Sequence, residues 1–116
     1  MDLANKVVIV TGGGTGIGRA TSLLLTERGA KVVVNYSRSQ SDAEETVRMI
    51  NDAGGQAIAI RADVSCDHDV QEMVHAAVLH YGNVDLLVNN ASITRHIPLN
   101  DLDGVTDEVW DELFAV

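Results

Sequence analysis

A glycine-rich segment close to the N-terminus restricts the folds open to this chain. It runs from Thr11 to Gly18, reads Thr-Gly-Gly-Gly-Thr-Gly-Ile-Gly, and follows an apolar run from Val7 to Val10. Glycine allows a positive φ in a tight turn and lets a helix or a ligand approach the backbone closely. Because a helical pattern follows, free N–H groups at the helix start would face an anion. The segment therefore predicts a phosphate-binding turn between a strand and a helix; the alternative is a turn that binds nothing.

The spacing of these glycines shows which nucleotide-binding motifs the segment can match. Gly12, Gly16 and Gly18 follow the pattern Gly-x-x-x-Gly-x-Gly, and no register gives Gly-x-Gly-x-x-Gly. No Lys-Ser or Lys-Thr pair follows, which excludes a phosphate loop of the Walker A type. The segment therefore matches neither of these two common motifs.

Four apolar runs rich in β-branched residues are typical of strands buried on both faces, as in a parallel sheet. They begin near Lys6, Lys31, Gln56 and Val84. Helical patterns separate the runs, and this alternation predicts right-handed βαβ crossovers and an α/β layer fold. With 116 residues the chain has the length of one domain.

Two helices are predicted between the first three strands. The first ends at Arg28 and Gly29, and its apolar face is predicted to consist of Ile17, Ala20, Thr21 and Leu24. The second begins at a capping box of Ser41 and Glu44 and ends at Gly54-Gly55. Its apolar positions are Ala43, Val47 and Ile50.

The third helix has the most regular apolar pattern in the chain, and Gly82 ends it. Its apolar positions are Val70, Met73, Val74, Ala77, Val78 and Tyr81. His68, Glu72 and His75 share the opposite face, where they could hold a metal ion. A solvated polar face explains them better, so we predict no metal site. A further amphipathic helix is predicted from Thr106 onwards.

Composition excludes several classes of protein. Hydrophobic residues make up 46% of the chain and charged residues 22%, as in an average soluble globular protein. The apolar runs are far shorter than the ~20 residues that span a bilayer. The N-terminus has no secretory signal pattern, and Cys66 is the only cysteine. We therefore expect a cytoplasmic protein with no membrane span and no internal disulfide.

The charge is unevenly distributed. The formal net charge is −9; residues 1–61 carry seven basic and six acidic residues (net +1), whereas residues 62–116 carry Arg95 against eleven acids (net −10). Such a chain has no broad basic surface to neutralise a phosphate backbone, which argues against nucleic-acid binding. One small anionic ligand near the N-terminal half remains compatible with the pattern.

Together with Asp63-Val64 and Asn89-Asn90-Ala91, the glycine segment closely resembles the short-chain dehydrogenase/reductase family, especially its 3-oxoacyl-carrier-protein-reductase-like members. The resemblance implies a Rossmann-type, doubly wound parallel sheet with strand order 3-2-1-4. It also implies cofactor contacts from three segments: pyrophosphate at Gly12, Gly14, Thr15, Gly16, Ile17 and Gly18, adenine at Asp63 and Val64, and the riboses at Asn89, Asn90 and Ala91. Ser92 stands where the family pattern has glycine. Alternatively, Asp63 caps the next helix, and the two asparagines are plain turn residues.

The residues after the second predicted strand bear on the choice of cofactor. An acidic residue there binds the ribose 2′-hydroxyl of NAD and repels the 2′-phosphate of NADP. This chain has Asn35, Tyr36, Ser37 and Arg38 instead, with no carboxylate. We predict that Asn35, Ser37 and Arg38 contact the cofactor and favour NADP(H) over NAD(H). The alternative is that Arg38 is merely solvated.

The resemblance implies hydride transfer between nicotinamide and a carbonyl or alcohol, by a serine, a Tyr-x-x-x-Lys pair and an asparagine. Tyr36 and Tyr81 are followed four residues later by Gln40 and Asp85, so no catalytic residue is assigned in this chain. We therefore expect residues 1–116 to be the N-terminal, cofactor-binding part of a single Rossmann-type domain whose catalytic part is absent. The expected partner of the full-length form is a small carbonyl or alcohol substrate, and a homo-oligomer is compatible with the family.

A second hypothesis is a non-catalytic module that binds NADP(H) or an adenine nucleotide, or an interaction protein. With strand order 3-2-1-4, the fourth strand would have an open apolar edge at Val84, Leu86, Leu87 and Val88. Such an edge pairs readily with other chains. We therefore expect the isolated chain to associate or to be poorly stable.

Overall fold

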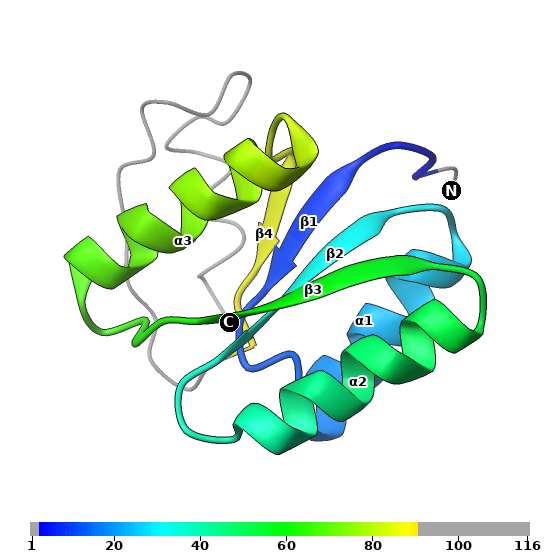
Figure 1. The fold of residues 1–116 in the computed structure, drawn as a ribbon, viewed down its shortest axis with the longest axis horizontal. Coiled ribbons are helices and arrows are strands. Elements are labelled where there is room, and N and C mark those ends of the chain that lie inside the picture. Colours follow the sequence, from blue (N-terminus) through cyan, green and yellow to red (C-terminus); the bar gives the residue numbers. More distant parts are fainter. Residues whose placement is uncertain (1–2, 91–116) are drawn as a thin grey trace.

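The structure is a computed structural model and describes residues 3–90. Strands and helices alternate along this part of the chain (Figure 1): β1 (Val7–Val10), α1 (Gly16–Glu27), β2 (Lys31–Tyr36), α2 (Gln40–Asp52), β3 (Gln56–Arg61), α3 (Asp67–Tyr81) and β4 (Leu86–Val88). The helix predicted from Thr106 lies outside the described residues.

The four strands form one parallel sheet in the order β3-β2-β1-β4. This order confirms the predicted doubly wound, Rossmann-type arrangement. β1 lies between β2 and β4, with Val8 opposite both Val32 and Leu86. Helices α1 and α2 cover one face of the sheet and α3 covers the other (Figure 1). Since parallel strands run the same way, the loops after β1, β2, β3 and β4 all lie at one edge of the sheet.

Alternate residues of the strands fill two cores. On the α3 face, Val7, Ile9 and Val33 pack with α3, and the helix contributes the buried residues Val70, Met73, Val74 and Ala77. On the opposite face, Val8, Val10 and Val32 pack with α2. The apolar pattern predicted for α3 is confirmed, as is its end at Gly82, where φ is 95°.

The apolar face predicted for α1 is wrong. Ile17 is 75% exposed and Leu24 is 49% exposed, whereas Gly18 and Ser22 are the buried residues of the helix. A Cβ built on Gly18 would lie 2.0 Å from the Gly12 carbonyl oxygen, so the start of α1 lies directly against the end of β1. At the start of the helix only small residues fit against the sheet because the backbones are this close, and farther along Leu23 and Leu25 pack against the core.

Two predicted element starts also need correction. The N-cap of α2 is Ser39, so Ser41 and Glu44 lie inside the helix and form no capping box; Glu44 instead accepts a hydrogen bond from Gln40. β4 begins at Leu86, because the Asp85 carboxylate accepts the hydrogen bond from the Val7 N–H at 2.8 Å. Within residues 3–90, no helix is long and apolar enough to cross a membrane.

Candidate cofactor-binding site

The glycine segment joins β1 to α1 at the edge where the parallel strands end. Gly12 has a φ of 61° and Gly16 a φ of 53°, values that favour glycine. Gly14 is required for a different reason, since a Cβ there would lie 2.8 Å from the backbone nitrogen of Ala43 in α2. The loop is thus shaped by positive φ at two positions and by close backbone contact at Gly14 and Gly18.

One residue of β2 accepts the hydrogen bonds from the N–H groups of Gly12 and Gly13. The side-chain oxygen of Asn35 accepts a hydrogen bond from the Gly12 N–H at 3.2 Å, and its carbonyl oxygen accepts one from the Gly13 N–H at 3.1 Å. Asn35 was predicted to contact the cofactor. In the structure its side chain is 2% exposed and its amide is bound to protein.

A second buried side chain holds the loop from α2. The Thr46 hydroxyl lies 2.9 Å from the carbonyl oxygen of Gly14 and 3.0 Å from that of Asp42. Arg19 of α1 donates to the same hydroxyl from Nε at 2.8 Å and to the Asp42 carbonyl from Nη2 at 3.1 Å. These contacts tie the glycine loop, α1 and α2 together.

The side chain of the N-cap residue does not cap the N-terminus of α1. Its N-cap, Thr15, has an extended backbone and makes no side-chain capping bond, and the first turn of the helix holds no acidic residue. The first N–H groups of a helix have no partner within the helix and carry a partial positive charge. Gly16, Ile17 and Gly18 therefore present backbone donors suited to a phosphate.

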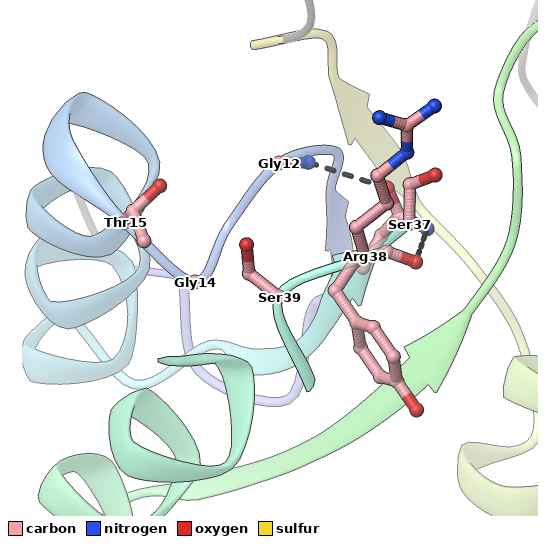
Figure 2. Close-up of a pocket in the computed structure, with 8 residues that line it drawn as sticks. Gly12, Gly14, Thr15, Ser37, Arg38 and Ser39 are labelled. Carbon is pink, nitrogen blue, oxygen red and sulfur yellow. Dashed lines mark hydrogen bonds between the residues drawn. The ribbon is translucent and has the colours of Figure 1, made fainter. Parts of the chain in front are cut away.

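A cavity of about 360 Å³ lies between the glycine loop and the turn that follows β2. Figure 2 shows the two segments facing each other, with the side chain of Ser39 between them. The residues that line it are Gly12, Gly14, Thr15, Asn35, Tyr36, Ser37, Arg38 and Ser39. None of these lining residues carries a carboxylate. Arg38 is exposed, and in the described part of the chain it forms no salt bridge.

The end of β4 is bound to the end of β1 through Thr11. The Thr11 hydroxyl lies 3.1 Å from the Asn89 side-chain oxygen and accepts a hydrogen bond from the Asn90 N–H at 2.8 Å. The side-chain Nδ2 of Asn90 lies 3.4 Å from the Gly12 carbonyl oxygen. The two predicted asparagines thus border the glycine loop, while Ala91 lies outside the described residues.

Asp63 follows β3 at the same edge of the sheet. Its Oδ1 accepts hydrogen bonds from the Ser65 N–H at 2.9 Å and from the Ser65 hydroxyl at 2.6 Å. These bonds from Ser65, with smaller contributions from the charges of Arg61 and Arg38, hold the pKa of Asp63 below its usual value. Asp63 does not cap α3, whose N-cap is Cys66 with no side-chain bond. Val64 is half-buried against the α3 core.

Six of the predicted contact residues line the cavity: Gly12, Gly14, Thr15, Asn35, Ser37 and Arg38. Sequence reasoning missed Tyr36 and Ser39. Ser39 carried a usable signal, since it continues the polar turn after Arg38 and precedes a helix. On α3, His68 and Glu72 are both exposed and lie 3.9 Å apart. Within residues 3–90, no group of three or more His, Cys, Asp or Glu residues could hold a metal ion.

Comparisons with known proteins agree with this geometry. Residues 6–116 match the family model for short-chain dehydrogenases. The chain is 64% identical over 109 residues to the short-chain dehydrogenase/reductase homolog YusS of Bacillus subtilis strain 168, and the match covers 94% of this chain and 100% of that one. It is 39% identical over 114 residues to hydroxynaphthalene reductase arp2 of Aspergillus fumigatus, covering 98% of this chain and 41% of the reductase.

A solved structure of a dehydrogenase is also similar to this chain. A Burkholderia cenocepacia protein described as a dehydrogenase, with NADP bound, is 30% identical and superimposes with a TM-score of 0.75; the match covers 99% of this chain and 43% of that one. The chain thus spans the whole of the Bacillus relative but less than half of the Aspergillus reductase and of the Burkholderia protein. With the strand order and the glycine loop, these matches show that the chain belongs to the short-chain dehydrogenase family.

Proposed function

We propose that this chain binds NADP(H) between the glycine loop and the turn after β2. We further propose that it forms the cofactor-binding part of an oxidoreductase that transfers a hydride between nicotinamide and a carbonyl or alcohol substrate. The observation that carries the proposal is the lining of the cavity. Hydroxyls from Ser37 and Ser39 and the charge of Arg38 stand where an NAD-binding site needs a carboxylate.

The donors fit two phosphate groups at different places. The pyrophosphate would lie over the start of α1, where Gly16 to Gly18 offer backbone N–H groups. The 2′-phosphate would lie against the β2–α2 turn, where Arg38 can make charge-assisted hydrogen bonds. The Burkholderia relative, which has NADP bound, supports this choice.

The remaining contacts follow the edge of the sheet. In the proposal, Asp63 and Val64 contact the adenine ring, and Asn89, Asn90 and Ala91 border the riboses. The Aspergillus relative is a reductase, which supports a carbonyl as the reducible group. Neither Tyr36 nor Tyr81 has a lysine four residues later, so in this proposal the rest of the domain supplies the proton-transfer groups.

A second candidate is a module that binds the cofactor without hydride transfer. The Bacillus relative favours it, because this chain spans that relative over its entire length. The two candidates make the same prediction for cofactor binding and differ in turnover. Both are therefore tested first by binding.

Arg38→Asp tests the assignment of the 2′-phosphate. A charge-assisted hydrogen bond contributes about 1.5–3 kcal/mol, so the dissociation constant for NADPH should rise at least about tenfold. The constant for NADH should change much less. Arg48→Asp is the matched control, because Arg48 lies on α2 outside the cavity and pairs with Glu45. An unchanged preference for NADPH over NADH in Arg38→Asp would show that the assignment is wrong.

A further inference from the structure

We propose that Asn35 is a positioning residue for the cofactor: it borders the cavity, but both ends of its buried amide are bound to protein, and the amide sets the backbone of the glycine loop. The inference rests on the proposed function, since it concerns how the same site grips a pyrophosphate. It replaces the direct contact predicted for Asn35 from the sequence.

Both ends of the Asn35 amide are bound to different chain segments. Its Oδ1 accepts the hydrogen bond from the Gly12 N–H at 3.2 Å (dashed in Figure 2), and its Nδ2 donates to the Ala62 carbonyl oxygen at 3.1 Å. Ala62 follows β3, and its own N–H donates to the Tyr36 carbonyl oxygen at 2.9 Å. One side chain thus connects the glycine loop after β1 to the chain after β3, across the end of β2.

The hydrogen bonds that Asn35 accepts determine the direction of the N–H groups in the glycine loop. The side-chain and main-chain oxygens of Asn35 take the N–H groups of Gly12 and Gly13, two successive residues. Between these two N–H groups the backbone turns through the positive φ of Gly12. The later N–H groups at the start of α1 are left for the anion.

Few side chains can replace Asn35. Its position requires one acceptor and one donor on the same short side chain. Aspartate offers two acceptors and would face the Ala62 carbonyl without a donor, and serine is too short to reach both partners. A buried polar group left without its partner is costly, so the loop should shift or loosen in such variants.

The expected effect of Asn35→Ser is specific. The grip on the pyrophosphate is common to both cofactors, so the dissociation constants for NADPH and NADH should both rise about tenfold while their ratio stays unchanged. Arg38→Asp, in contrast, should change the ratio. Val33→Ala is the matched control, because Val33 is equally buried in β2 but packs in the α3 core.

The experiment combines cofactor titration of these variants with NMR on the unmodified protein. A scalar coupling across the hydrogen bond between the Gly12 N–H and the Asn35 side chain should be present, and Asn35→Ser should shift the Gly12 and Gly13 amide resonances. Absence of that coupling overturns the inference even if no variant folds. It is also overturned if Asn35→Ser binds both cofactors as the unmodified protein does, or if Val33→Ala loses affinity equally. Failure of the unmodified protein to bind either cofactor would instead refute the proposed function.

Discussion

The hydroxyl of Thr46, in the middle of α2, lies 2.9 Å from the carbonyl oxygen of Gly14 in the glycine loop. Thr46 is fully buried, and the residues are 32 positions apart in the sequence. The loop is therefore not shaped by its glycines alone. It is also held by Thr46 of α2, a residue that lies outside the glycine motif.

Replacing Thr46 with valine keeps the volume but removes the hydroxyl. The Gly14 carbonyl and the Arg19 Nε would each lose a partner. A buried group left without its hydrogen bond costs about 1–3 kcal/mol, and the free energy of unfolding in denaturant should fall by that order. Thr46→Ser keeps the hydroxyl and should recover most of the loss. Equal stability of Thr46→Val and the unmodified protein would contradict this role.

Gly18→Ala should destabilise the protein, although alanine ordinarily favours a helix over glycine by about 1 kcal/mol. The added Cβ would lie 2.0 Å from the Gly12 carbonyl oxygen, a backbone atom that cannot move without displacing the loop. Overpacking of this kind costs about 1–3 kcal/mol. Thermal unfolding measures the change. A raised melting temperature would show that α1 lies farther from β1 than described.

Ile17→Ser should leave the stability nearly unchanged. The side chain is 75% exposed, and exposed substitutions usually stay within about 0.5 kcal/mol. Ile50→Ala, at a position that is 1% exposed in the α2 core, should cost about 2–5 kcal/mol. Denaturant unfolding of both variants provides the comparison. Similar losses of stability for the two variants would show that Ile17 belongs to a buried apolar face of α1, as the sequence predicted.

The two hydrogen bonds from Ser65 stabilise the ionised form of Asp63 and lower its pKa. Ser65→Ala removes the hydroxyl bond, so the pKa of Asp63 should rise toward its usual value, as measured by carbon NMR of the carboxyl group. Because the folded-state pKa is the lower one, this group stabilises the fold above its unfolded-state pKa. The contribution is lost as the pH falls through the folded-state value.

Ser41→Ala is the control for this titration, because Ser41 is exposed on α2 and makes no contact with Asp63 in the described residues. It should leave the Asp63 titration unchanged. An unchanged titration in Ser65→Ala would show that the turn after β3 is held differently.

The sequence predicted most of the fold because its signals there are local and strong. The periodicity of α3 and the glycine after it sufficed to place that helix, and the β-branched runs sufficed for the strands. Hydrophobic periodicity failed for α1, because its fully buried positions are Gly18 and Ser22, while Leu23 and Leu25 are only partly buried against the core. Apolar periodicity cannot reveal positions that are buried because they are small.

The sequence predicted most of the residues that line the cavity, but it did not predict the role of each residue. Six cavity-lining residues were identified from motif and position. Nothing local distinguishes an asparagine that faces a ligand from one that binds backbone groups after β1 and β3, as Asn35 does. Nor does the sequence around Thr46 indicate a contact with Gly14, because that contact depends on how α2 packs against the loop.

The most direct test of the account is the affinity of the purified chain for NADPH and for NADH, measured by calorimetric titration under the same conditions. We expect both cofactors to bind at one site and NADPH to bind at least about tenfold more tightly, as a charge-assisted contact to the 2′-phosphate requires. Equal affinities, or tighter binding of NADH, would contradict the role given to Ser37 and Arg38. Absence of binding by either cofactor would contradict the proposed function itself.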